Sequence, residues 1–385
     1  TVFLSIDHRI NDSEGSLHAN LLIYNFKTKT IEYFEPNGSG YVNDSIHNVL
    51  KEELCWNTGF KYLEPKDYSP VASFQYLAME NNKYELKDTV KNQDITLPDE
   101  YSHWTMKEID EQFDSSLRAI SLGGRLLDND KVKLGGLEEH KEILLRIDNI
   151  IILGCGTSYF AGLLGVNYLK DLCSFNTVQI FDGAEFNEND IPKFGSTALI
   201  LLSQSGETKD LHRCIAIAKE YELYTIGVVN VVDSLIAREV DCGCYLHAGR
   251  EVAVASTKSF TSQLIVLLSI AMKIGMYNKK ITSEKYKSFI ENLKLVPNFL
   301  SKILSLDEKF INFAQALKNS QNILYLGRGI LYPLALEGAL KLKELSYIHS
   351  EGFAAGEMKH GPIALIEEGL PVIMFLTSDG IEEKS

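Results

Sequence analysis

The chain has 385 residues, 45% of them hydrophobic and 23% charged, which is the composition of an ordinary globular protein with room for two or three domains. Its net charge of −14 disfavours a nucleic acid or an anionic membrane as a partner, and we find no apolar run long enough to span a bilayer. The six cysteines form no Cys-x-x-Cys pairs of the kind that bind zinc, and their spacing is not that of a disulfide framework. We therefore expect reduced thiols in a cytoplasmic protein.

The N-terminal region, residues 1–70, predicts a small α+β unit to which we assign no function. Residues 18–24 and 30–34 have the pattern of strands, and a turn at 36–38 and a helix at 45–53 follow. Residues 71–113 are polar and weakly patterned, and we interpret them as a connector that ends in a helix at the entrance to the next domain.

From residue 114 onward the pattern is α/β. Apolar runs at 149–153, 177–181, 197–202 and 224–229 alternate with helical stretches at 158–171, 208–221 and 258–275. This alternation predicts a doubly wound parallel sheet with helices on both faces and ligands at the carboxyl ends of the strands. We expect a first domain at 114–285 and a helical linker at 286–320.

A second α/β domain is expected at 321–385. It would begin with a strand at 322–326 and a helix at 333–347, continue with a loop and a helix through 366, and reach a strand at 372–376. Because so few strands leave an edge unpaired and apolar faces uncovered, we interpret this domain as partial.

Turns that contain glycine follow three of the predicted strands, and two of these turns also carry hydroxyls. They are Gly154-Cys-Gly-Thr-Ser158, Ser203-Gln-Ser-Gly-Glu-Thr208 and Gly327-Arg-Gly329. A turn of this kind places backbone N–H groups and hydroxyls at the positive end of a helix dipole, which suits a phosphate group. Neither glycine pair completes Gly-x-Gly-x-x-Gly, so a nucleotide cofactor is disfavoured. The alternative is ordinary helix capping, and we expect Ser203, Ser205 and Ser256 to serve as N-caps as well.

These segments resemble the SIS (sugar isomerase) domains of glutamine–fructose-6-phosphate aminotransferases. Further matching stretches are 106–112, 254–258, 336–344, 346–351 and 355–362, the last of which contains Gly356-Glu-Met-Lys-His-Gly-Pro362. The resemblance covers residues 101–385 and not the first hundred, where this family carries a glutaminase domain with an amino-terminal cysteine.

The resemblance implies conversion of fructose 6-phosphate to glucosamine 6-phosphate, in amino sugar biosynthesis, without a metal or a cofactor. It also implies a homodimer and a set of residues that hold the sugar phosphate. That set is Cys155, Gly156, Thr157, Ser158, Ser203, Gln204, Ser205, Thr208 and Ser256. We expect Cys155 to be a small filler in the turn rather than a nucleophile, since no base is suggested beside it.

The chemistry requires a group that moves a proton between adjacent carbons and a group that opens the sugar ring. By resemblance, Glu344 is the carbon acid/base, with Lys341 three residues earlier on the same helix face. The alternative is that Lys341 and Glu344 form a surface ion pair with no catalytic role. His360 would open the ring and reach the site of the neighbouring subunit.

Two other functions stay open. A SIS-domain sugar-phosphate deaminase or deglycase would fit the missing glutaminase motifs. A non-catalytic sugar-phosphate sensor would fit the lack of the family's C-terminal tail, whose lysine forms a Schiff base with the keto sugar.

Overall fold

The computed structural model describes residues 2–8, 18–25, 30–34, 61–63, 101–121, 124–127 and 131–376. The chain divides into two compact units, Thr1–Ile95 and Thr96–Ser385. The described part of the first unit is a sheet in the order β1 (Val2–His8), β2 (His18–Asn25), β3 (Thr30–Phe34), β4 (Lys61–Leu63), antiparallel except for the last pair. The two strands predicted here are therefore confirmed, whereas the predicted turn at 36–38 and helix at 45–53 lie outside the described residues.

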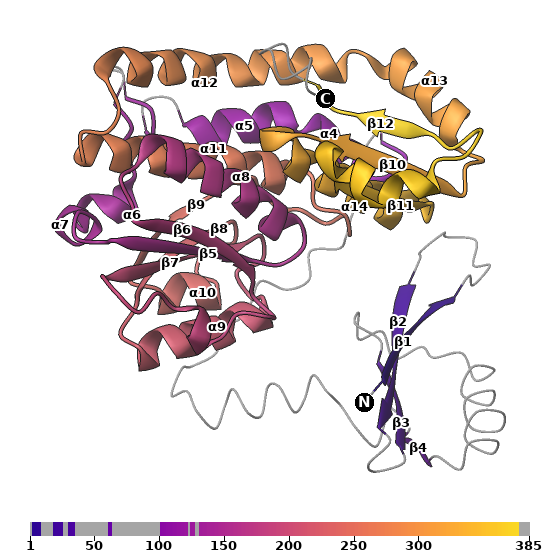
Figure 1. The fold of residues 1–385 in the computed structure, drawn as a ribbon, viewed down its shortest axis with the longest axis horizontal. Coiled ribbons are helices and arrows are strands. Elements are labelled where there is room, and N and C mark those ends of the chain that lie inside the picture. Colours follow the sequence, from indigo (N-terminus) through magenta and orange to yellow (C-terminus); the bar gives the residue numbers. More distant parts are fainter. Residues whose placement is uncertain are drawn as a thin grey trace. The chain divides into compact units, whose positions relative to one another are not determined.

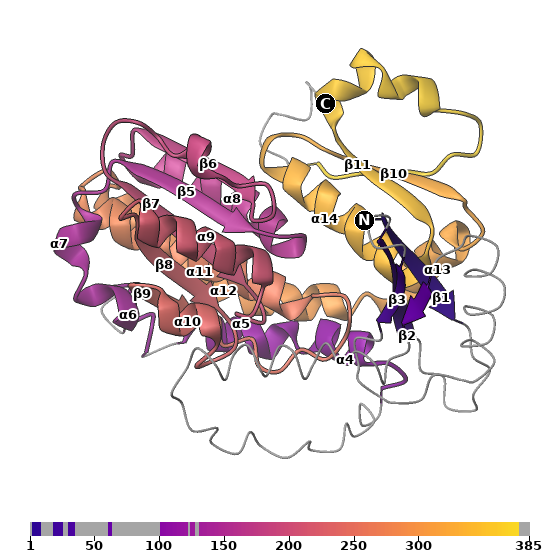
Figure 2. The same ribbon diagram turned by 90° about the horizontal axis from the view of Figure 1, so that it is seen from below.

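The second unit contains a parallel sheet in the order β6-β5-β7-β8-β9 (Figures 1 and 2). Its strands are β5 (Asn149–Gly154), β6 (Thr177–Asp182), β7 (Thr197–Ser203), β8 (Tyr224–Val229) and β9 (Cys242–Tyr245). The four predicted strands are confirmed. Strand β9 was not predicted, because its four residues include a glycine and form no long apolar run.

Helices cover both faces of this sheet, as predicted. α8 (Thr157–Leu172) and α11 (Lys258–Tyr277) lie on one face, and α9 (Lys209–Glu220) and α10 (Leu235–Glu239) lie on the other (Figure 1). Alternate residues of β5 point to opposite faces, so Ile150 and Ile152 join the core cluster with α8 and α11, while Ile151 and Leu153 join the cluster with α9. Burial on both faces explains why the central strands β5 and β7 are apolar runs, whereas the edge strand β6 keeps exposed positions.

Helix α11 corrects one expectation from the sequence. By length and composition it could cross a membrane, but 67% of its apolar window is buried inside the fold. Its contacts with α8 and α5 (Gln112–Ile120) are those of a core helix. The expectation that no segment reaches membrane-spanning length was therefore wrong, and packing accounts for the hydropathy.

The remaining helices frame the sheet. α4 (Trp104–Asp110) and α5 precede it, and the short α6 (Gly135–Glu138) and α7 (Lys141–Leu144) lead into β5. After α11 come α12 (Ser283–Leu304) and α13 (Asp307–Leu317), which occupy the predicted linker. The domain boundaries at 70, 113, 285 and 320 stay a prediction.

A smaller parallel sheet follows, in the order β11-β10-β12 within the described part of the chain. It consists of β10 (Asn322–Gly327), β11 (His349–Ala354) and β12 (Val372–Met374), with α14 (Tyr332–Ser346) packed against β10 and β11. The predicted loop before 366 was wrong in part, because residues 349–354 form a strand; the 3-10 helices η4 (Ala355–His360) and η5 (Pro362–Leu365) come after it.

Candidate active site

The turn after β5 depends on a close approach of strand and helix. A Cβ atom on Gly154 would lie 2.9 Å from the carbonyl carbon of Ser158 and from the backbone nitrogen of Tyr159. Gly156 is the N-cap of α8 and has a φ of 54°, which favours glycine. The two glycines therefore let the 16-residue helix begin directly at the strand end, so that its N-terminus faces the space above the sheet.

The turn after β7 is held by its own hydroxyls. The buried Ser203 Oγ accepts a hydrogen bond from the Gly206 amide at 2.9 Å and lies 2.8 Å from Thr208 Oγ1. Ser205 Oγ accepts from the Glu207 amide at 3.1 Å. These bonds fix the shape of the turn before α9 begins.

The expected N-cap role of Ser203, Ser205 and Ser256 is wrong. The N-cap residues of α9 and α11 are Thr208 and Thr257. The helices begin a few residues later than the capping argument assumed, and the serine hydroxyls instead bond within the loops.

The two turns lie at the switch point of the sheet. β5 and β7 are neighbours, but the chain runs from β5 outward to β6 and from β7 outward to β8. Connections that leave in opposite directions open a crevice at the carboxyl ends of the two strands, where ligands of such sheets bind. The fold thus brings the segments 155–158 and 203–208 to one edge of the sheet.

Helix α14 adds a row of charges to this region. Glu337, Lys341 and Glu344 occupy one face of the helix, with Lys341 Nζ 2.6 Å from Glu344 Oε2 and 3.6 Å from Glu337 Oε1. Thr157 Oγ1, at the start of α8, donates to Glu337 Oε1 at 3.2 Å. This hydrogen bond joins the turn after β5 to the charged face of α14.

Glu337 is the functional candidate that the sequence reading missed. Its residue is 6% exposed, and Oε2 is buried without a hydrogen-bond partner among the described residues. Burial raises the pKa of Glu337 to about 7, even though Lys341 and Thr157 favour the charged form. A signal was available, because Glu337 stands one helical turn before Lys341 on the face already singled out.

The ion pair between Lys341 and Glu344, which was the alternative to a catalytic role, is present. The Glu344 side chain is 30% exposed. An ion pair does not exclude a catalytic role. The assignment of Glu344 and Lys341 to catalysis stays a prediction.

His360 comes from a different element than this cluster. It is exposed at the end of η4, and within the described residues no hydrogen bond or ion pair connects it to Glu344. Its role in ring opening stays a prediction as well.

Other predicted residues differ in their exposure within the two turns. Thr157 and Gln204 are partly exposed in the two turns, whereas Ser158 is buried and its Oγ accepts from Gln263 Nε2 at 2.8 Å. Burial, with the charge of Asp182, raises the pKa of Cys155 to about 11, so its thiol stays protonated at neutral pH, as expected of a filler.

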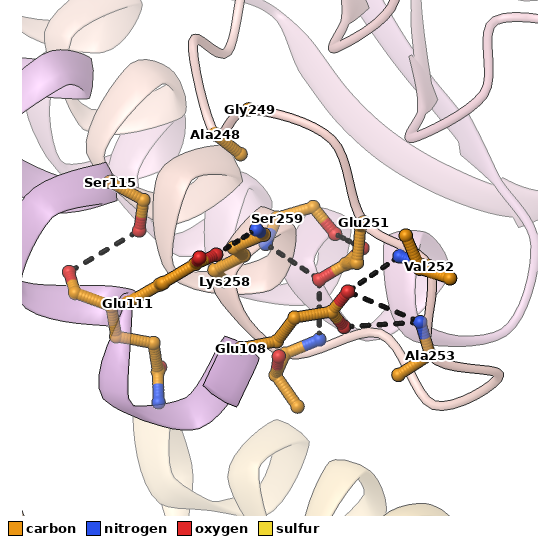
Figure 3. A network of polar contacts seen from close by, with 12 residues as sticks. Glu108, Glu111, Ser115, Ala248, Gly249, Glu251, Val252, Ala253, Lys258 and Ser259 are labelled. Carbon is orange, nitrogen blue, oxygen red and sulfur yellow. Dashed lines mark hydrogen bonds and ion pairs between the residues drawn. The ribbon is translucent and has the colours of Figure 1, made fainter. Parts of the chain in front are cut away.

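Ser256 lies on the loop between β9 and α11. Its Oγ is 3.1 Å from Glu251 Oε2 and 2.5 Å from Ser259 Oγ. At the tip of this loop Val254 is 95% exposed. Figure 3 shows the polar contacts that hold the base of the loop.

Comparison with known proteins identifies the family. The SIS domain profile matches residues 143–273 and 316–384. The C-terminal domain of glucosamine-fructose-6-phosphate aminotransferase from Francisella tularensis is 31% identical with a TM-score of 0.70, over 75% of this chain and 80% of that one. A glucosamine-6-phosphate deaminase from Thermotoga maritima is 26% identical with a TM-score of 0.57, over 73% of this chain and 79% of that one.

The chain therefore belongs to the SIS-domain family. Its resemblance to glutamine–fructose-6-phosphate aminotransferases is confirmed by a probable isomerizing enzyme of that name from Acanthamoeba polyphaga mimivirus, 39% identical over 371 residues. That alignment covers 91% of this chain and 59% of the viral protein. The chain spans about half the length of the curated relatives that it matches.

The same alignment corrects one expectation. Coverage of 91% cannot come from residues 101–385 alone, so the similarity extends into the first hundred residues. The sequence reading placed its start near Tyr101, because the preceding region carries no motif that can be matched by inspection.

Proposed function

We propose that this chain binds fructose 6-phosphate and glucosamine 6-phosphate and carries out the isomerising half of glucosamine 6-phosphate synthesis. The observation that carries the proposal is the pair of hydroxyl-lined turns at the switch point, together with the hydrogen bond from Thr157 in the first turn to the buried Glu337 on α14, whose pKa is raised to about 7. The first feature suits a phosphate group, and the second provides proton-transfer groups beside it.

The phosphate is held by neutral donors. The turn hydroxyls and the N-terminus of α8 supply hydrogen bonds and a partial positive charge, which compensate for the chain's net charge of −14. Hydroxyls also do not compete for the proton that the reaction moves.

The proton moves on the α14 side. In the imine formed with loss of water from fructose 6-phosphate and ammonia, the Glu344 carboxylate removes a proton from C1 while the imine nitrogen takes one from solvent, which gives an enolamine. Glu344, whose side chain is 30% exposed and whose proton exchanges with solvent, then gives a proton to C2 while the O1 hydrogen leaves to solvent, which yields the aldehyde and the C2 amine. Lys341 holds Glu344 in place by its ion pair, and Glu337 exchanges a proton with its surroundings near pH 7.

Calorimetry with glucosamine 6-phosphate tests the binding step. We expect Ser205→Ala and Thr208→Ala to weaken affinity by about tenfold to a hundredfold, the effect of losing a hydrogen bond to a charged group. Thr282→Ala, which removes a capping hydroxyl at α12 instead, serves as the control. Unchanged affinity in both turn variants would place the phosphate elsewhere.

Solvent tritium incorporation into the sugar tests the chemical step. Glu344→Gln should abolish exchange and leave binding intact, because the amide preserves the shape of the carboxylate. Exchange at the parent rate would assign the base to another residue. Binding without exchange in the parent chain would favour the sensor.

A second candidate is deamination of glucosamine 6-phosphate to fructose 6-phosphate and ammonia, favoured by the fold shared with the Thermotoga maritima deaminase. The same proton transfer runs in reverse, and water replaces the amine. Ammonia release from glucosamine 6-phosphate distinguishes this activity from synthesis.

We also infer a cytoplasmic homodimer in which His360 reaches the neighbouring site. The exposure of His360, which no hydrogen bond or ion pair joins to Glu344 within the described residues, supports this arrangement. Mixing Glu344→Gln with His360→Ala should restore activity, because one site of each hybrid dimer then keeps both residues. Failure of mixing to restore activity, with both variants folded, would place His360 in the site of its own chain.

A further inference from the structure

The loop that carries Ser256 is held by an acidic side chain from a distant part of the sequence. Glu108 on α4 is 1% exposed. Its Oε1 accepts the Val252 amide at 2.5 Å and the Ala253 amide at 3.2 Å, and its Oε2 lies 3.3 Å from the Ala253 nitrogen (Figure 3). One carboxylate thus receives two consecutive backbone N–H groups of the loop.

A second carboxylate closes the base of the same loop. Glu251 Oε1 accepts the amides of Thr257 at 2.9 Å and Ser259 at 3.3 Å, and Oε2 accepts the Ser259 hydroxyl at 2.6 Å. Glu251 therefore connects the two ends of the segment 251–257. Glu108, which comes from another helix, holds Val252 and Ala253 within that segment.

Further polar contacts lock α4 and α5 onto this region. Lys258, which is buried at the start of α11, forms an ion pair with Glu111 (Figure 3). Arg118 Nη2 donates to the Ala248 carbonyl at 2.9 Å, and Thr261 Oγ1 donates to Gln112 Oε1 at 2.7 Å. Helix α5 and its junction with α4 are thus held on both sides of the loop. These contacts fix the position of Glu108, which lies in the last turn of α4.

The carboxyl group of Glu108 is buried where it meets the loop. Burial, and the nearby Glu251, raise the pKa of Glu108, which shows that its charged form is held at a cost. This charge stabilises the backbone amides of Val252 and Ala253, which precede the exposed Val254.

We propose that Glu108 is a positioning residue that holds the loop 251–257, and with it Ser256, in the conformation that meets the sugar. This role rests on the proposed function. Glu108 does not touch the substrate; it acts through the backbone of Val252 and Ala253.

The test compares Glu108→Ala and Glu108→Gln with the parent chain. Calorimetry measures affinity for glucosamine 6-phosphate, and hydrogen exchange measures protection of the loop amides without sugar. If Glu108→Ala leaves the loop in the required conformation about a tenth of the time, affinity falls about tenfold. Glu108→Gln should restore affinity to within about twofold, because one amide oxygen can still accept both N–H groups, as Oε1 does now.

Glu138→Gln is the matched control. Its carboxylate also accepts a backbone amide, from Leu134 at 3.0 Å, and an ion pair from Lys273. Lys273 lies about 22 Å along α11 from Lys258, at 1.5 Å per residue. This variant should lose stability without losing affinity.

The outcomes separate the two claims. Rapid loop exchange with unchanged affinity in Glu108→Ala overturns the positioning role and leaves sugar binding intact. Equal losses of affinity in Glu108→Ala and Glu138→Gln also overturn it, since a general loss of stability then explains both. A parent chain that binds no sugar phosphate overturns the proposed function and the positioning role together.

Discussion

Replacing Glu337 by glutamine should change how the stability of the chain depends on pH. Burial raises the pKa of this carboxyl from 4.5 to about 7 in the folded protein. The folded state then binds more protons than the unfolded state between these values, so stability falls as pH rises from about 4.5 to about 7 and levels off above that. Glutamine does not titrate and lacks this contribution.

The magnitude follows from the size of the shift. One pKa unit corresponds to about 1.4 kcal/mol, so a shift of this size contributes at most about 3 kcal/mol. The side chain is 8% exposed, so solvent screening reduces the figure little. Relative to the parent, Glu337→Gln should gain up to about 3 kcal/mol between pH 4.5 and pH 8.

Urea unfolding of both proteins across this range, followed by circular dichroism and fluorescence, measures the difference. Subtracting the curves removes the titration of other groups, and coincidence of the two probes checks two-state behaviour. Lys341→Met should extend the decline in stability to higher pH, since Lys341 is the main group that lowers this pKa. A difference between parent and Glu337→Gln that does not vary with pH would show that folding does not raise the pKa of Glu337.

Two further substitutions and one labelling experiment test the turns. Gly154→Ala should abolish sugar-phosphate binding, because a Cβ 2.9 Å from the backbone of α8 displaces the helix, and calorimetry would show it. Ser203→Ala should lower the free energy of unfolding by about 1–3 kcal/mol, the cost of an unpaired buried amide, here that of Gly206; an unchanged thermal midpoint would contradict this. Iodoacetamide should modify Cys155 slowly at pH 7.5 and faster as pH approaches its pKa of about 11, as followed by mass spectrometry; rapid labelling at neutral pH would mean that the thiol is activated.

Much of the α/β fold could be predicted because its strands are buried on both faces. Such strands are apolar at every position, as in Ile150-Ile-Ile-Leu153, and they stand out without any alignment. Strands β9 and β11 could not be found in this way, because Cys242-Gly-Cys-Tyr245 and His349-Ser-Glu-Gly-Phe-Ala354 contain too few apolar residues.

The candidate site was predicted where it depends on local sequence and missed where it depends on packing. Turn residues such as Thr157 and Ser205 are recognisable from glycines and hydroxyls that follow a strand. The importance of Glu337 and Glu108 comes from burial against segments 180 and 144 residues away. Local patterns in the sequence do not reveal contacts between segments that lie so far apart in the chain.

The bond from Thr157 to Glu337 has a consequence for the ligand. A hydroxyl carries one hydrogen, and here it is given to a carboxylate on α14. If a phosphate group takes that hydrogen, Glu337 loses a donor that favours its charged form, and the incoming negative charge disfavours that form further. Ligand binding would then cause Glu337 to take up a proton from solvent. The Thr157 hydroxyl thus couples the occupancy of the crevice at the first sheet to the charge of Glu337, on the helix that packs against the second sheet.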